Sequence, residues 1–294
     1  MSERTIRFAI FGNEYQAKKS ASIQKILAVL AGRGAVVSID KPFFEFLKAE
    51  HIDVKDASVF TDDDFEADFV ISMGGDGTLL KAASRVGKKG LPIIGVNIGR
   101  LGFLSDTIPS EIDKAIDALY EGNYRLEDHS VISVDTDTNE LKGTRFALND
   151  IAVLKRDTAS MIGISTSVDG EYVVTYQADG LIVSTPTGST AYGLSNGGPI
   201  IVPTTDVLCL TPVAPHSLNI RPIVIGGDSE VTLTVSSRSH NFLLAIDGQS
   251  EKLTEGAKVT IKKAPYTIKI VKLPNKHYYS TLRDKMMWGM DSRG

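Results

Sequence analysis

The chain has 294 residues, of which 42% are hydrophobic and 23% are charged, enough for one large globular domain or two of ordinary size. Its formal net charge of -4 argues against a broad nucleic-acid-binding surface, which would need clustered positive charge. Cys209 is the only cysteine, so the sequence excludes an intrachain disulfide and a cysteine-rich zinc site. The apolar neighbours of Cys209 predict that it is buried.

The sequence shows no pattern of export or membrane insertion. Its first apolar run, at 8–12, is shorter than the roughly 7–15 apolar residues of a signal peptide and has no cleavage pattern after it. No stretch approaches the roughly 18 apolar residues that cross a bilayer. We therefore expect a soluble, cytoplasmic protein that has neither a membrane nor a nucleic acid as a partner.

The first ~125 residues alternate between apolar strand-like runs and segments with helical periodicity. We expect strands at 7–11, 35–39, 68–73 and 91–97, and helices at 20–31, 43–50, 79–86 and 110–120. The alternation predicts a mostly parallel sheet with helices on its faces. We assign this α/β domain to 1–126, and expect the segment 275–294 to rejoin it because Leu282 and Met286 have helical spacing.

From about His129 the sequence changes to short runs rich in β-branched residues. Asp169-Gly170 and Asp247-Gly248 predict tight hairpin turns, because this dipeptide tolerates the positive φ angles that such turns need. We therefore expect an all-β, sandwich-like C-terminal domain at 127–274.

The segment Gly74-Gly75-Asp76-Gly77-Thr78 lies where a buried strand ends and a helix is expected to begin. Glycine lets backbone N–H groups approach a ligand closely, and a helix start carries partial positive charge, so this turn can bind phosphate. A carboxylate in such a place makes sense if it handles a hydroxyl proton or a metal ion. The segment matches neither the P-loop nor the dinucleotide fingerprint. The simpler alternative is a glycine-rich turn with an incidental aspartate.

Two further segments carry polar side chains beside apolar strands. The run at 185–190 concentrates hydroxyls and a glycine ahead of Tyr192, which suits recognition of a base edge and a ribose. The alternative is a capped helix start with Ser189 or Thr190 as N-cap. Asn149 and Asp150 interrupt an apolar strand, which indicates either a strand end or a site.

Five segments together resemble the NAD kinases, in the expected order and over nearly the whole chain: GGDGT at 74–78, NIGRLGFL at 97–104, ND at 149–150, DGLIVSTPTGSTAYGLSNGGPI at 179–200 and PHSLNIRPIVI at 215–225. GGDGT alone is moderately specific, because diacylglycerol, sphingosine and phosphofructokinases carry versions of it. Its combination with the 179–200 segment and the Asn-Asp pair is highly specific.

The resemblance implies ATP-dependent phosphorylation of the adenosine ribose 2′-hydroxyl of NAD, giving NADP. It also implies an α/β domain, a β-sandwich and an active site between them. ATP would be the co-substrate, with a divalent cation, Mg²⁺, helping to hold it. The partners implied are NAD, ATP and further copies of the chain, as a dimer or tetramer in which a neighbouring subunit contributes to the NAD pocket.

Carried over to this sequence, the resemblance makes Asp76 the catalytic proton acceptor. Asn149 and Asp150 resemble the pair that binds the ribose and base region of NAD. The full set of expected substrate- and nucleotide-binding residues is Gly74, Gly75, Gly77, Thr78, Lys81, Asn149, Asp150, Asp179, Thr187, Thr190, Ala191, Tyr192, Gly193, Leu194, Ser195, Ala214 and Gln249. The sequence indicates no metal-ligating residue.

The chain departs from the family pattern at two places. Most relatives have Asn-Glu where this chain has Asn149-Asp150, and some bacterial members carry His and Arg near Ser160 and Gln177. These departures leave the choice between NAD and NADH, and between ATP and polyphosphate, open. The alternative functions are a lipid kinase sharing GGDGT and a nucleotide-binding regulator without catalysis.

Overall fold

The computed structural model describes residues 5–14, 20–54, 56–98, 102–138, 140–156 and 160–289. The chain divides into two compact units, the first made of 1–128 with 268–294 and the second of 129–267. The chain passes between them within β6 (Arg125–Thr136) and β17 (Lys258–Lys272). Over the described residues, no helix has the length and apolar character that crossing a membrane requires.

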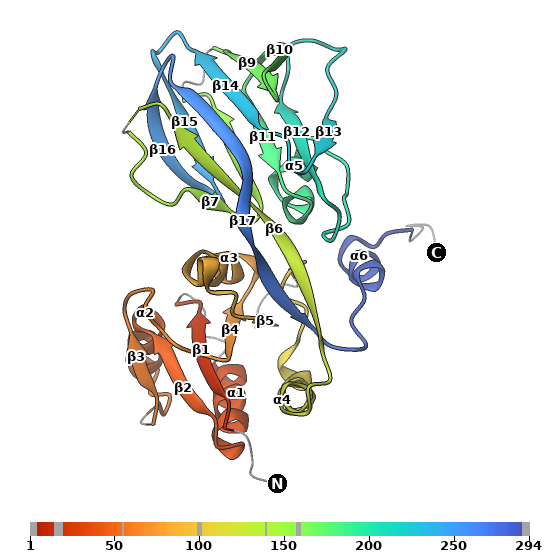
Figure 1. Ribbon diagram of the computed structural model, residues 1–294. Helices are drawn as coiled ribbons and strands as arrows, with labels where there is room; N and C mark the ends of the chain where they lie inside the picture. Colours follow the sequence, from red (N-terminus) through yellow and green to blue (C-terminus); the bar gives the residue numbers. More distant parts are fainter. Residues whose placement is uncertain are drawn as a thin grey trace. The chain divides into compact units, whose positions relative to one another are not determined.

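The first unit contains a parallel sheet in the order β17-β5-β4-β1-β2-β3 (Figure 1). Its further strands are β1 (Arg7–Gly12), β2 (Val36–Asp40), β3 (Ser58–Phe60), β4 (Phe69–Gly74) and β5 (Ile93–Asn97). Its helices are α1 (Ser20–Gly32), α2 (Lys41–Ala49), α3 (Asp76–Val86), α4 (Ile112–Glu121) and α6 (Tyr278–Met286), with single turns η2 (Gly87–Lys89) and η3 (Pro109–Glu111). The fold class expected for this half of the chain is confirmed.

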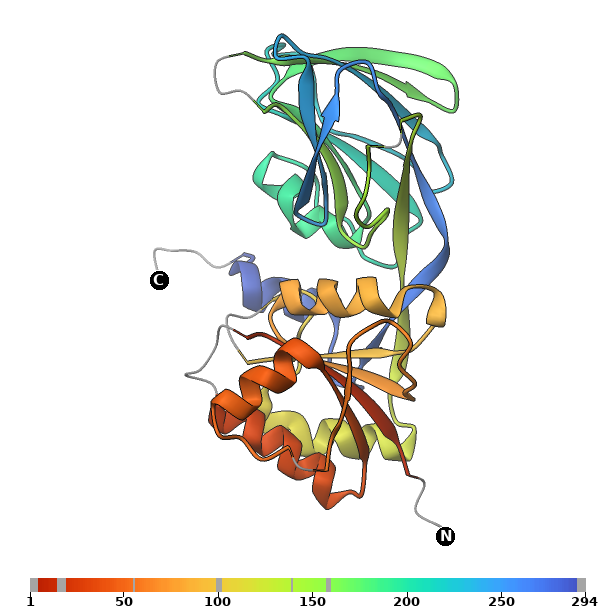
Figure 2. The same cartoon turned by 90° about the vertical axis from the view of Figure 1, so that its left-hand side faces the viewer.

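The helices of this unit cover both faces of the sheet. Ile23, Ile26 and Leu30 of α1 pack in one core with apolar residues of α2 and α4. Figure 2 draws α3 on the opposite side of the sheet from α1 and α4, and α6 on the same side as α3. Because both faces are covered, β4 and β5 are buried along their whole length, which explains their continuous apolar runs.

This arrangement creates a topological switch point between β1 and β4. The helix that follows β1 covers one face of the sheet, and the helix that follows β4 covers the other. The two strands are parallel neighbours, so Gly12 and Gly74 end them at the same edge. Ligands of open α/β sheets bind outside the carboxyl ends of the strands at such a point, and GGDGT lies there.

The second unit consists of two sheets whose inner faces share one core. One sheet has the order β10-β9-β14-β17, with β6 pairing β17 and β7; the other has the order β13-β12-β11-β8-β15-β16 (Figure 1). The remaining bounds are β7 (Phe146–Ala147), β8 (Asp150–Leu154), β9 (Ile162–Val168), β10 (Glu171–Ala178), β11 (Gly180–Ser184), β12 (Val207–Val213), β13 (Ile223–Gly226), β14 (Val231–Ser236), β15 (Asn241–Ile246) and β16 (Gln249–Thr254). The second sheet is antiparallel throughout, which confirms the sandwich-like class.

The two predicted hairpin turns are confirmed by their backbone angles. Asp169 and Gly170 have φ of 52° and 83°, and Asp247 and Gly248 have φ of 46° and 83°. Both dipeptides therefore occupy the left-handed region that tight hairpins require. Cys209 is buried in β12, also as predicted.

The structure departs from the sequence interpretation in three local details. Helix α3 begins at Asp76, three residues before the predicted start, because Gly75 takes the extended N-cap conformation directly after the strand. The short strand β3 was not predicted, since it buries only Phe60. Ser189 and Thr190 do not cap a helix: they lie within the turn η4 (Thr187–Thr190), and Ala191 precedes α5 (Tyr192–Ser195).

A buried ion pair ties the end of β17 into the first unit. Lys272 Nζ lies 2.6 Å from Asp106 Oδ2, and each residue is 8% exposed. An ion pair so placed contributes little net stability, whereas losing one partner leaves an uncompensated buried charge.

We expect Lys272→Met to lower the free energy of unfolding by about 3–5 kcal/mol, because Asp106 would stay buried without its partner. Adding Asp106→Val should restore most of this loss. Urea unfolding of the single and double variants checks the prediction. A single variant as stable as the wild type would contradict the structural role of the pair.

Candidate functional site

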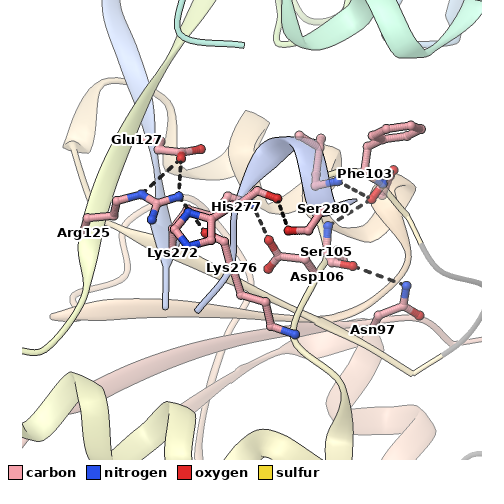
Figure 3. A network of polar contacts seen from close by, with 12 residues as sticks. Asn97, Phe103, Ser105, Asp106, Arg125, Glu127, Lys272, Lys276, His277 and Ser280 are labelled. Carbon is pink, nitrogen blue, oxygen red and sulfur yellow. Dashed lines mark hydrogen bonds and ion pairs between the residues drawn. The ribbon is translucent and has the colours of Figure 1, made fainter. Parts of the chain in front are cut away.

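The Asp76 carboxylate is held by the backbone of the segment that follows β5. Oδ2 accepts a hydrogen bond from the N–H of Phe103 at 2.6 Å, and Oδ1 accepts from Leu104 at 3.0 Å and Ser105 at 3.1 Å. Figure 3 shows Phe103 and Ser105 of this segment, with the Ser105 carbonyl accepting from Asn97 Nδ2 at the end of β5. These contacts fix the carboxylate at the switch point of the sheet.

The distribution of these bonds leaves the two oxygens of Asp76 unequal. A carboxylate offers about two acceptor positions on each oxygen. Within the described part of the chain, Oδ1 receives two donors and Oδ2 one. Because Asp76 is also partly exposed, Oδ2 is the oxygen with room for a further donor, such as a substrate hydroxyl.

The glycines around Asp76 serve two different purposes. A Cβ at Gly74 would overlap the Thr78 side chain, and one at Gly102 would overlap the Asp76 carboxylate. These two glycines therefore allow the protein itself to pack closely. A Cβ at Gly75 or Gly77 would meet no described atom within 4 Å, so these positions leave open space at the first turn of α3. A ligand can approach the backbone there.

Lys81, expected to offset phosphate charge, has carboxylate partners within the protein. Its ammonium lies 2.8 Å from Asp40 and 3.5 Å from Glu14. The other oxygen of the fully buried Asp40 accepts from Arg85 at 3.2 Å. The structure therefore places Lys81 in an ion-pair cluster at the end of β2.

In the second unit, the buried carboxylate of Asp150 lies near the partly exposed Asp247. Asp247 accepts backbone N–H bonds from Leu148 and Asn149 at 2.8 Å and from Asp150 at 3.1 Å. Burial raises the pKa of the Asp150 carboxyl to about 7, and the Asp247 charge adds to this effect. Burial also raises the pKa of Asp247, although its three backbone donors oppose the shift.

The segment after β11 folds tightly against the Asn149-Asp150 segment. Thr185 donates from its hydroxyl to the Leu148 carbonyl at 2.6 Å and from its N–H to the Asn149 carbonyl at 2.9 Å. A Cβ at Gly188 would overlap the Asn149 backbone, so only glycine fits there. The structure thus brings Asn149 and Asp150 together with the beginning of η4.

The remaining expected residues of this segment lie in η4 and α5. Thr187 is 3% exposed, and its hydroxyl lies 2.8 Å from Nδ1 of His129. Thr190 donates to the Thr187 carbonyl at 3.3 Å. The Tyr192 side chain is 40% exposed. Gly193 is buried, while Ala191, Leu194 and Ser195 are partly or fully exposed.

Asp179 and Ala214 lie at the opposite end of β11 from Asp150. Ser184 pairs with Asp150, whereas Asp179 donates its N–H to Val213 and its carboxylate pairs with Lys155 at 2.7 Å. At ~3.3 Å per residue, Asp179 lies about 17 Å from Ser184. Ala214 directly follows Val213 and has a φ of 43°. Gln249 begins β16 beside the Asp247 turn, at the Asp150 end.

Three parts of these surroundings were missed by sequence reasoning. Asp247 was considered only as a hairpin residue, and neither His129 nor Lys285 was expected to contribute to a site. No local signal distinguishes them, because each reaches its place through contacts with distant segments. No group of three or more potential metal-ligating side chains occurs among the described residues.

Comparison with known proteins gives matches over both units. The ATP-NAD kinase N-terminal domain matches residues 10–124, and the ATP-NAD kinase C-terminal domain matches residues 148–273. The NAD kinase of Bacteroides fragilis is 54% identical over 98% of this chain and 100% of that protein.

Two solved structures share the fold. An NAD kinase from Archaeoglobus fulgidus, in complex with ATP, is 26% identical, with a TM-score of 0.72 over 96% of this chain and 99% of that one. Yeast NADH kinase complexed with NADH is 21% identical, with a TM-score of 0.88 over 99% of this chain and 90% of that one. The domain matches and the full-length identity confirm the family expected from the sequence. The chain belongs to the NAD kinase family.

Proposed function

We propose that this chain transfers the γ-phosphoryl group of ATP to the 2′-hydroxyl of the adenosine ribose of NAD, and that Asp76 accepts the hydroxyl proton. The observation that carries these roles is the Asp76 carboxylate, which three backbone donors hold at the switch point with room left on Oδ2. The direct test is formation of NADP from purified protein, ATP, Mg²⁺ and NAD. NADH and polyphosphate are the alternative substrates to compare in the same assay.

Phosphoryl transfer depends mainly on positioning the hydroxyl, the γ-phosphoryl group and the leaving oxygen in line, with the developing charge neutralised. The first turn of α3 offers backbone N–H groups and partial positive charge, with open space over Gly75 and Gly77. Asp76 in that turn is held fixed, so it can orient the hydroxyl without reorganising. In a loose transition state the ribose hydroxyl loses its proton late, so the position of the carboxylate matters more than its basicity.

A magnesium ion fits this donor set. Mg²⁺ usually keeps several waters and binds one or two carboxylates together with substrate phosphates. When bound, the cation neutralises charge on the phosphates. Asp76, in the first turn of α3, is the carboxylate that would face such a cation.

The adenosine part of NAD is assigned to the site around Asn149 and Asp150. There, buried and partly exposed polar groups converge from the start of β8, from η4 and from α5. Because its pKa lies near neutrality, the Asp150 carboxyl can accept or donate a hydrogen bond to a ribose hydroxyl. Tyr192, the first residue of α5, offers an aromatic side chain that is 40% exposed.

We further propose that the protein works as a homo-oligomer. Within one unit, the length of β11 separates Asp179 and Ala214 from Asp150. If all these residues serve one NAD molecule, Asp179 and Ala214 come from a neighbouring subunit. Ser160 and Gln177 line a cavity of about 590 Å³ together with Lys155, next to Asp179. The cytoplasmic location stays a prediction from the sequence.

Asp76→Asn should lower kcat by at least ~10²-fold, because the amide cannot accept the hydroxyl proton. If the new NH₂ group replaces Oδ2, it faces the N–H of Phe103. If it replaces Oδ1, the N–H groups of Leu104 and Ser105 lose their acceptor. Either orientation should cost about 1–3 kcal/mol in stability. Initial rates of NADP formation and thermal unfolding separate the two effects. Turnover close to that of the wild type would rule out Asp76 as the proton acceptor.

Asp150→Asn should stabilise the ligand-free protein increasingly as the pH rises from about 4 to about 7, with no further gain at higher pH. The folded-state pKa of about 7 lies above the ordinary value of 3.8, so over this range the unfolded state has released a proton that the folded state retains, and wild-type stability falls. At ~1.36 kcal/mol per pKa unit, the gain is about 4 kcal/mol at most. Urea unfolding of both proteins across this pH range measures it. A pH-independent difference would show that ionised Asp150 is not destabilising.

A further inference from the structure

The C-terminal helix α6 carries a lysine whose charged end is buried. Lys285 Nζ has essentially no exposed surface and makes no hydrogen bond with the described residues. It lies 5.1 Å from the ring centre of Phe103, within cation–π reach of the residue whose N–H binds Asp76. The buried Leu282, one turn earlier, anchors the helix in the first unit.

The carboxylates near Lys285 are already engaged by other groups. Asp76 and Asp106 are the acidic residues whose charges act on it. Asp76 accepts three backbone donors, and Asp106 pairs with Lys272 at 2.6 Å. Lys272 and Lys276 add like charges to the surroundings, and Lys276 pairs with Glu111 at 2.8 Å. Burial lowers the pKa of Lys285 to about 8, so the side chain is still mostly protonated at neutral pH.

A buried ammonium group has three hydrogen-bond donors, and leaving them without an acceptor is costly in free energy unless a ligand supplies one. The ligand must be anionic, because the charge is positive and lies among other lysines. It must also bind near Asp76, whose charge reaches Lys285. A phosphoryl group bound at the first turn of α3 meets both conditions. Lys81 is less suited, because its ammonium already contacts Asp40 and Glu14.

We propose that Lys285 is a phosphate-binding residue of the kinase site: its partly exposed, flexible side chain turns Nζ out of its buried position and donates from α6 to the triphosphate held beside Asp76. This inference rests on the proposed function for its place in the reaction. In the reaction, the ammonium would neutralise charge that develops on the transferred phosphoryl group, as cationic side chains do at other phosphoryl-transfer sites. The C-terminal segment would then complete the active site of the first unit.

The test compares Lys285→Met, Lys285→Arg and the control Arg283→Met, which removes an exposed positive charge from the same helix. We expect Lys285→Met to lower kcat/KM for ATP by about 10²-fold. The KM for NAD should stay within about twofold of the wild type. Lys285→Arg should recover part of the activity, and Arg283→Met should retain nearly all of it.

Stability and binding provide readouts that are independent of turnover. A lysine kept for packing would make Lys285→Met less stable, whereas a lysine kept for ligand binding should leave Tm unchanged or raise it. Calorimetric titration with inorganic tripolyphosphate should show at least about tenfold weaker binding to Lys285→Met. Equal tripolyphosphate affinity of variant and wild type would overturn the proposal, whether or not the wild type forms NADP. Tight tripolyphosphate binding that needs Lys285, without NADP formation, would overturn only the proposed function.

Discussion

The candidate catalytic site depends on one interaction: the Asp76 carboxylate binds the backbone N–H groups of Phe103, Leu104 and Ser105. This contact joins the helix that follows β4 to the segment that follows β5. It holds the carboxylate and the 103–105 segment in a defined position relative to each other. Gly102 is required beside it, because any side chain there would overlap the carboxylate. The aspartate therefore has a structural role and a chemical one, and a substitution affects both.

The second unit uses the same device. Asp247 accepts three consecutive N–H groups at 148–150 and holds the start of β8, where Asn149 and Asp150 lie. This arrangement is electrostatically unfavourable, because the buried Asp150 carboxylate lies near the partly exposed Asp247, and desolvation raises the pKa of both. A polar ligand that offers donors to Asp150 would offset that cost. Both proposed substrate sites thus rest on segments that an aspartate holds in place.

The sequence predicted the elements better than the contacts between them. Apart from β3, the strands and helices of the first unit follow from periodicity, and the role of Gly74 to Thr78 follows from the chemistry of a glycine turn. The partners of Asp76 could not be predicted, because they depend on β4 and β5 being parallel neighbours. Lys81 has the spacing of a phosphate ligand, yet it faces Asp40 at the end of β2. Lys285 lies some 200 residues along the chain from Asp76, whose charge acts on it, and no local sequence pattern identifies it as a site residue.

The most direct measurement is the position of the NAD 2′-oxygen in a crystal structure with Mg²⁺ and a non-hydrolysable ATP analogue. Our account predicts this oxygen within about 2.6–3.2 Å of Asp76 Oδ2, with the N–H groups of Phe103, Leu104 and Ser105 still bound to the carboxylate. A ribose whose 2′-oxygen contacts another base, with Asp76 directed only at its own backbone partners, would contradict it.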